Sequence, residues 1–172
     1  YDKLGYVTQK AVLFAGSIRE NVFFGESAAP ETDEELKNAI ELSQAEEFVD
    51  KLPDGTEHMI SQMGRNVSGG QKQRLSIARA LSRKPEILVF DDSFSALDYK
   101  TDAKLREGLN EKLKDTTKII VAQRISTIRH ADKIIVLDRG EAVGMGTHEE
   151  LMKNCDVYKE IALSQLSAAE LA

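Results

Sequence analysis

Ser68, Gly69, Gly70 and Gln71 form a stretch that can bind a phosphate group through the start of a helix. Ser68 followed three residues later by Gln71 matches a capping box, so we predict a helix that begins here with unpaired amides. Each glycine lowers helix propensity by about 1 kcal/mol, but the missing Cβ lets a ligand approach the backbone. The helix dipole and the free N–H groups favour anionic oxygens at such an end. An ordinary capped helix has the same local pattern, so the surrounding residues must decide between the two.

Two carboxylates, Asp91 and Asp92, directly follow an apolar run at residues 87–90. Four apolar residues bounded by Pro85 and two acids predict a strand that is buried on both faces, as in a parallel sheet. Ligands bind at the carboxyl ends of strands in open α/β sheets, so both carboxylates are candidate site residues. The alternative is a strand that simply ends in polar residues.

A third motif, Ser-Ala-Leu-Asp at residues 95–98, comes just after these carboxylates. With the helix start and the acid-terminated strand, it closely resembles the nucleotide-binding domain of ATP-binding cassette (ABC) transporters. In that family Ser-Gly-Gly-Gln is the signature, the strand closed by Asp is the Walker B element, and Ser-Ala-Leu-Asp is the D-loop. The resemblance covers essentially the whole chain. It implies an α/β fold of the P-loop NTPase type, with a mostly parallel sheet core and a helical signature subdomain.

The resemblance implies a role for each candidate residue, with ATP and Mg²⁺ as cofactors. A short predicted strand at residues 4–7 leads into Gln9, which matches the family's Q-loop glutamine; a lone glutamine would be taken for an exposed polar residue. Mg²⁺ would be contacted by Asp91 and Gln9, and the catalytic positions are occupied by Asp92 and Gln123. The residues implied to contact ATP are Gln9, Ser68, Gly69, Gly70, Gln71 and Asp98.

Both catalytic positions depart from the family pattern. The family generally has Glu after the Walker B aspartate, as the base that polarises the attacking water, and Asp92 is about one methylene shorter. The switch histidine is replaced by Gln123, which can hydrogen-bond a phosphate but cannot carry a proton as imidazole can. Together the two changes resemble the degenerate half of a heterodimeric ABC exporter. In such a pair each ATP lies between one subunit's Walker motifs and the other's signature. Residues 68–71 would therefore serve the partner's site, and Asp91, Asp92 and Gln123 this chain's own weak site.

Residues 17–21, Ser-Ile-Arg-Glu-Asn, are similar to the exporter version of the segment after the Q-loop. Gln62 occupies the position from which exporters usually present Glu or Gln to the membrane domains. The regions of residues 9–21 and Gln62 are therefore expected to contact transmembrane domains, which would cover apolar groups there. No apolar run approaches the ~20 residues of a membrane span, so we expect attachment to the cytoplasmic face of the membrane through those domains.

No Gly-Lys dipeptide occurs in the 172 residues, although ATP sites of this class need Gly-x-x-x-x-Gly-Lys-Ser/Thr. We therefore expect a C-terminal part of a cassette, with the Walker A loop upstream, that is inactive as an ATPase alone. The regions expected within this partial domain are the Q-loop region at 1–22, the helical and signature subdomain at 30–84, the core with Walker B, D-loop and switch at 85–152, and a helical tail at 153–172.

Composition limits the other classes of function. The net charge of −6 argues against a nucleic-acid partner, and a single cysteine excludes an internal disulfide. A soluble ABC-type ATPase of DNA repair or translation is the first alternative, although no long coiled-coil insertion separates Gln9 from Ser68. The second alternative is an allosteric module that binds nucleotide without hydrolysis. This alternative stays open because Asp92 and Gln123 depart from the family pattern. The transported substrate is chosen by membrane domains, so the sequence of this chain does not indicate it.

Further patterns predict the remaining elements. Thr32 with Glu35 matches a second capping box, before a helix with an apolar face, and a second helix is expected at residues 46–52. A helix is expected from Thr101 to about Lys114, and a buried strand at residues 118–122. A hairpin is expected at residues 134–145, a helix capped by Thr147 and Glu150 after it, and a helical tail at residues 157–171.

Overall fold

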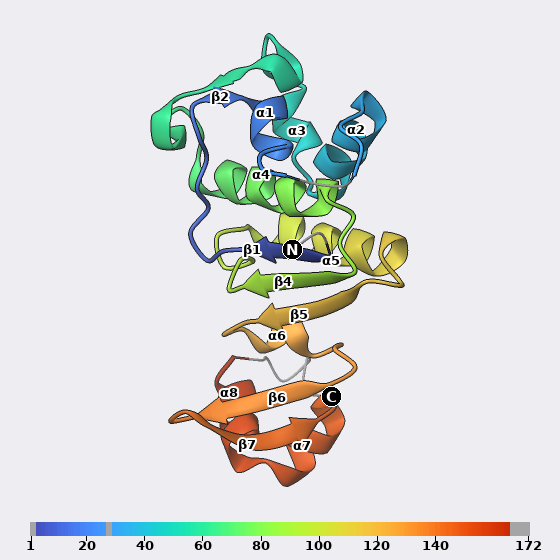
Figure 1. The fold of residues 1–172 in the computed structure, drawn as a ribbon. Helices are drawn as coiled ribbons and strands as arrows, with labels where there is room; N and C mark the ends of the chain where they lie inside the picture. The colour runs from blue at the N-terminus through green and yellow to red at the C-terminus, as the bar shows by residue number, and fades with distance from the viewer. Residues whose placement is uncertain (1–2, 27–28, 166–172) are drawn as a thin grey trace. The chain divides into compact units, whose positions relative to one another are not determined.

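The structure is a computed structural model that describes residues 3–26 and 29–165 (Figure 1). The chain divides into two compact units, Tyr1–Val121 and Ala122–Ala172. Each unit has its own apolar core. Within the described residues, no helix is both long enough and apolar enough to cross a membrane.

The first unit contains a parallel sheet of three strands, β1 (Leu4–Val7), β4 (Ile87–Asp91) and β5 (Thr117–Val121), in the order β1-β4-β5. Tyr6 pairs with Val89, and Val89 pairs with Ile119. The predicted strands and their parallel arrangement are therefore confirmed. Because the strands are parallel and in register, Asp91 lies at the carboxyl edge of the sheet, opposite Val121.

The two faces of this sheet differ in burial. Val7, Leu88 and Phe90 are fully buried in the core that the helices of this unit share. The side chains that alternate with them are more exposed, and Ile119 and Val121 are 50% and 52% exposed. The expectation that strands β4 and β5 are buried on both faces is therefore wrong. An apolar run indicates a strand, but it does not say how many layers pack against it.

The helical part of the first unit is built around helix α4 (Gly69–Ser82), which begins at Ser68 as predicted. Helix α2 (Asp33–Leu42) packs against α4, and Leu36, Ala39 and Ile40 on its predicted apolar face are buried, together with Ser43 at its end. The other elements here are helix α1 (Ile18–Val22), helix α3 (Glu46–Val49), the antiparallel strands β2 (Gly16–Ser17) and β3 (Met59–Ile60), and the 3₁₀ turns η1 (Gly55–Glu57) and η2 (Gln62–Gly64).

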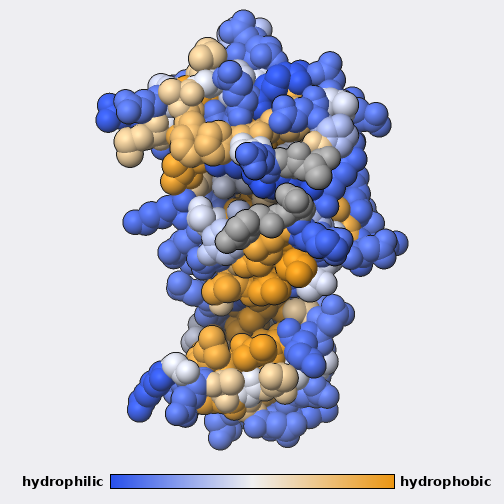
Figure 2. All heavy atoms as spheres, viewed as in Figure 1, coloured by the Kyte–Doolittle hydropathy of each residue, from blue (hydrophilic) through white to orange (hydrophobic). Residues whose placement is uncertain are grey.

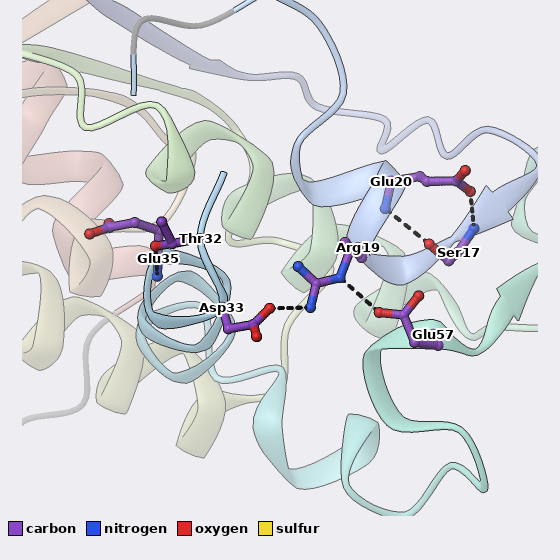
Figure 3. A network of polar contacts seen from close by, with 7 residues as sticks. All are labelled: Ser17, Arg19, Glu20, Thr32, Asp33, Glu35 and Glu57. Atoms are coloured by element: carbon purple, nitrogen blue, oxygen red, sulfur yellow. Dashed lines mark hydrogen bonds and ion pairs between the residues drawn. The ribbon is translucent and has the colours of Figure 1, made fainter. Parts of the chain in front are cut away.

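The capping box predicted at Thr32 and Glu35 forms only one of its two hydrogen bonds. The Thr32 hydroxyl accepts from the Glu35 amide at 3.2 Å, but the Glu35 carboxylate pairs with Lys84 at 2.6 Å. A long-range ion pair therefore replaces the reciprocal cap that the sequence predicts. A complete capping box forms instead at Ser17 and Glu20, before helix α1 (Figure 3).

Two other helix boundaries differ from the expectation. Helix α5 (Tyr99–Lys112) begins at Asp98 and not at Thr101, because the Asp98 carboxylate accepts from the Thr101 amide at 3.0 Å and caps the helix. Helix α3 has only four residues, and Leu52 follows it in a turn. Leu105 and Leu109 of α5 are buried, as their spacing predicts.

The second unit contains the predicted hairpin and the helices after it. Thr147 and Glu150 form the predicted capping box, and residues 166–171 of the predicted tail helix lie outside the described part of the chain. Its elements are helix α6 (Ile125–Ile128), the antiparallel strands β6 (Ile134–Asp138) and β7 (Glu141–Gly146), helix α7 (His148–Asn154) and helix α8 (Asp156–Gln165).

Gly5 provides a test of how tightly the first unit is packed. A Cβ on Gly5 would lie 2.7 Å from Leu88 Cδ1, 2.9 Å from Pro85 Cγ and 3.0 Å from the Ala80 carbonyl oxygen. Gly5→Ala should therefore lower the free energy of unfolding by about 1–3 kcal/mol, as other overpacked cores do. The urea midpoint should fall with little change in m. Gly69→Ala is the matched control, since no atom of the described residues outside its own helix turn lies within 4 Å of the added Cβ, and its midpoint should not fall.

Candidate functional site

The signature helix start is exposed and ordered by local hydrogen bonds. The Ser68 hydroxyl accepts from the Gln71 amide at 3.3 Å, and the Gln71 side-chain oxygen accepts from the Ser68 amide at 2.8 Å. Gly69 is exposed, and no atom of the described residues outside its own helix turn lies within 4 Å of the position of a Cβ. The D-loop lies close by, since a Cβ on Gly70 would be 3.4 Å from the Ala96 carbonyl oxygen. The amino end of a 14-residue helix is thus open to an anionic ligand.

Asp91 has an aromatic partner that the sequence did not single out. The Tyr6 hydroxyl donates to Asp91 Oδ2 at 3.0 Å, and this hydrogen bond raises the pKa of the Tyr6 phenol above its ordinary value. The contact runs from β1 to the carboxyl end of β4. Alternation along β1 could have placed Tyr6 on the same sheet face as Asp91, but only if the register were known.

Asp92 lies next to the Q-loop glutamine. Gln9 Nε2 donates to Asp92 Oδ2 at 3.3 Å, although 83 positions separate the two residues in the chain. Asp92 has a φ of 46°, a left-handed conformation that is uncommon outside glycine. Its amide donates to Val121 O at 2.9 Å, and its carbonyl accepts from the Ser95 hydroxyl at 2.8 Å. Neighbours therefore hold the backbone of Asp92 in a conformation of the kind that concentrates at functional sites.

Two buried polar side chains hold the backbone just before Gln9. Ser93 is fully buried, and its hydroxyl donates to the Val7 carbonyl oxygen at 2.8 Å. Gln73 of helix α4 is 1% exposed and donates from Nε2 to the Thr8 carbonyl oxygen at 3.2 Å. The sequence patterns indicate neither residue as part of the site. For Gln73 the available signal is a polar residue on the buried stripe of a helix, but the pattern does not identify its partner.

Asp98 has a local structural partner. It caps helix α5 and accepts from the Thr101 hydroxyl at 2.7 Å and from the Thr101 amide at 3.0 Å. The hydrogen bond from the Thr101 hydroxyl is the main reason that the pKa of the Asp98 carboxyl is lowered. A lowered carboxyl pKa stabilises the fold above the ordinary pKa, and this contribution is lost as the pH falls through the lowered value. The contact of Asp98 with ATP stays a prediction.

Gln123 belongs to the second unit, so it is not among the residues that the first unit brings together. Its carbonyl oxygen accepts from Gln165 Nε2 at 2.8 Å, while Gln165 Oε1 accepts from the Ile125 amide at 2.9 Å. Helix α8 thereby fixes the backbone on both sides of Arg124. The structure gives Gln123 a defined backbone position within its own unit, and its catalytic role stays a prediction.

The residues near Asp91 fit a magnesium ion of the kind that nucleotides bring with them. Mg²⁺ prefers oxygen ligands and is usually held by one or two carboxylates together with substrate phosphates and water. Asp91 and Asp92 are adjacent at the carboxyl edge of the sheet and only partly buried, and the Gln9 amide reaches Asp92. No group of three or more candidate metal ligands of the His, Cys, Asp and Glu types occurs among the described residues. The donor set therefore suits an ion whose remaining ligands come from outside this group of residues.

Comparisons with known proteins show the family of this chain. The family model described as ABC transporter matches residues 1–95. YfiB of Bacillus subtilis, an ABC transporter ATP-binding protein, is 46% identical over 163 residues, which cover 95% of this chain and 28% of YfiB. A Rickettsia felis protein named as an export ATP-binding/permease protein is 43% identical over 164 residues, with the same coverage of 95% and 28%.

A solved structure shows the same fold. The structure of a bacterial Atm1-family ABC exporter with ATP bound matches with a TM-score of 0.88 and 34% identity, over 95% of this chain and 28% of that one. The parallel sheet, the open signature helix and the paired carboxylates define a nucleotide-binding domain of the ABC type. The chain belongs to the ABC transporter family. It spans about 28% of the length of the relatives named above.

Proposed function

We propose that this chain is part of the ATP-binding subunit of an ABC exporter. It would pair head to tail with a second cassette and couple ATP binding and hydrolysis to transport through membrane domains. The observation that carries the proposal is the exposed signature at Ser68 and Gly69, in the same unit as the contact between Gln9 and Asp92. The relatives named as ATP-binding and export proteins support the proposal.

The signature is proposed to act on a nucleotide held by the second cassette. Ser68 and Gly69 would donate hydrogen bonds to its γ-phosphate, since the helix start is exposed and positively polarised. The open space at Gly69 supports this role, because another polypeptide with its nucleotide can approach the backbone there. Asp92 and Gln123, which depart from the family pattern in this chain's own site, support a different subunit as the partner.

The chain's own site is proposed to bind ATP and Mg²⁺ but to hydrolyse slowly. Bound ATP with Mg²⁺ supplies the phosphoanhydride that is cleaved and the positive charge that offsets its oxygens. Asp91 and Gln9 would contact the ion, and Asp92 would orient water from a side chain one methylene shorter than Glu. A base displaced by ~1 Å can cost about 100-fold in rate. Gln123 cannot carry a proton at the switch position. We also infer that the 172 residues alone hydrolyse no ATP, because they contain no Gly-Lys phosphate loop.

Membrane domains are proposed to dock beside strand β2. Val12, Phe14 and Phe24 are 55%, 42% and 48% exposed, and Met63 next to Gln62 is 65% exposed. Figure 2 shows apolar atoms gathered over the region in which Figure 1 places β2 and α1. Exposed apolar side chains in one area mark an interaction surface. This surface supports the proposed exporter over a soluble ABC-type ATPase, with the chain attached at the cytoplasmic face of the membrane.

Cell fractionation with the full-length protein tests this proposal. We expect the protein to sediment with membranes, to stay there in high salt, and to be released by detergent together with a second ABC cassette. The purified complex should hydrolyse ATP only with Mg²⁺. A protein that stays in the high-speed supernatant would support the soluble ATPase instead. A membrane complex that binds ATP without turnover at either site would support the allosteric module.

A further inference from the structure

Arg79 connects the signature helix to the segment after the Q-loop. From helix α4 its guanidinium donates to the Asn21 carbonyl oxygen at 2.7 Å, to the Val12 carbonyl oxygen at 2.9 Å, and to Asn21 Oδ1 at 3.1 Å. These acceptors lie 58 and 67 positions away in the sequence. One side chain therefore binds both ends of the segment 12–21, which includes the exporter-like residues.

Two stacked phenylalanine rings lie against the same guanidinium. The rings of Phe14 and Phe24 are 4.1 Å apart between centroids, and Arg79 Cζ is 5.4 Å and 5.5 Å from these centroids. Within the described residues, Arg79 forms no ion pair with a carboxylate. Burial, with a smaller effect of Arg83, lowers the pKa of the Arg79 guanidinium to about 10. Backbone oxygens and aromatic faces thus replace a counter-ion and make the side chain specific for this segment.

Asn21 closes the segment from the other side. Its Nδ2 donates to the Phe14 carbonyl oxygen at 2.9 Å and to the Ser17 carbonyl oxygen at 3.0 Å. The Phe14 amide donates to Asn21 Oδ1 at 2.9 Å, the same oxygen that Arg79 contacts. Asn21 is 2% exposed, so the central side chain of this network is shielded from water. Arg79 therefore binds a loop that Asn21 already closes by hydrogen bonds to Phe14 and Ser17.

The helix that carries Arg79 also carries the signature. Ser68 caps its amino end, and Arg79 comes about three turns, or roughly 16 Å, further along. Gln73, between them, donates to the Thr8 carbonyl oxygen next to Gln9. A displacement of the signature end must therefore carry the segment 12–21 with it, as long as the Arg79 contacts hold. Exposed Val12, Phe14 and Phe24 would move as part of the same body.

We infer that Arg79 is a positioning residue that locks the segment 12–21 to the signature helix and transmits nucleotide-dependent motion to the exposed apolar surface of Val12, Phe14 and Phe24. The transmission part rests on the proposed function, whereas the locking part does not. The fork of the guanidinium is essential, because three acceptors on two residues are bound at once. Lysine keeps the charge but cannot reproduce this planar fork.

Hydrogen exchange of the full-length protein, followed by mass spectrometry, tests the locking part. Arg79→Lys and Arg79→Met should each speed amide exchange in residues 12–17 by about tenfold or more, while the middle of helix α4 stays protected. Arg74→Met is the matched control. Arg74 lies on the same helix and makes the same kinds of contact, donating to the Gln44 carbonyl at 2.8 Å with Cζ 4.9 Å from the Phe48 ring centroid. Its loss should loosen residues 43–49 and leave residues 12–17 unchanged.

The same measurement with and without ATP and Mg²⁺ tests transmission. In the unaltered complex, nucleotide should change exchange both at residues 66–72 and at residues 12–17. In Arg79→Lys the change at residues 66–72 should persist, and the change at residues 12–17 should be lost. A role in folding alone would instead alter both regions together. The inference is overturned if residues 12–17 stay protected in both Arg79 variants, or if they respond to nucleotide as in the unaltered complex. If nucleotide changes exchange nowhere in the unaltered complex, the proposed function is contradicted. The locking part is then still decided by comparing the Arg79 variants with the unaltered protein in the absence of ATP.

Discussion

Gly69→Asp is expected to reduce ATP hydrolysis by the paired cassettes by about 1,000-fold, although it alters no residue that holds the partner's nucleotide. The added carboxylate would lie against the γ-phosphate at the open helix start. Like charges at ~4 Å repel by about 4 kcal/mol at an effective dielectric constant of 20, which corresponds to this factor. The structure leaves room for the side chain, so the loss should occur in a folded protein. Steady-state hydrolysis by the purified complex measures the effect.

Gly69→Asn is the control that separates charge from size. It has nearly the same volume as the aspartate variant and no charge, so it should retain much more activity. Binding of ATP to the partner cassette alone should be unchanged in both variants, because the partner's own phosphate loop is intact. Normal hydrolysis by a folded complex with Gly69→Asp would mean that the signature is only a capped helix.

Asp92→Glu combined with Gln123→His is expected to raise turnover at this chain's own site, by up to about 100-fold. The longer carboxylate restores the reach of the base, and the imidazole restores a group that can carry a proton. The contact of Asp92 with Gln9 places the altered residue beside the Q-loop glutamine. Turnover must be measured with the partner's catalytic glutamate replaced, so that only this site contributes.

The single changes are the controls for this pair. Each alone should give a smaller gain than the double variant, because base and switch act on one reaction and their effects are coupled. An unchanged rate in the double variant, with ATP still bound, would contradict the assignment of Asp92 and Gln123 as the cause of weak hydrolysis.

Local chemistry made part of this structure predictable. The cap at Ser68 and Gln71 depends on four consecutive residues, and the capping box at Thr147 and Glu150 does too; both occur as expected. The box expected at Thr32 failed because Glu35 pairs with Lys84, 49 positions away. A short window of sequence around Thr32 does not include Lys84, which competes for the Glu35 carboxylate.

The contacts that hold the candidate site could not be predicted in the same way. The predicted residues Gln9 and Asp92 do meet, but this contact follows from the parallel register of the sheet. Gln73, Ser93 and Arg79 act through backbone carbonyls, and any residue type can supply a carbonyl. The sequence therefore does not indicate which residues they bind. For Gln73, a polar residue on a buried helix stripe at least indicates that a partner exists.

The most direct test of the central claim is a structure of the assembled transporter trapped with ATP and Mg²⁺. We predict that the Ser68 hydroxyl and the amides at the start of helix α4 lie about 3 Å from the γ-phosphate of an ATP whose phosphate loop belongs to the other cassette. The same structure should show Asp91, Asp92 and Gln9 around a second nucleotide. If Ser68 faces solvent, or contacts only residues of its own chain while both nucleotides are bound, the proposed role of this chain is contradicted.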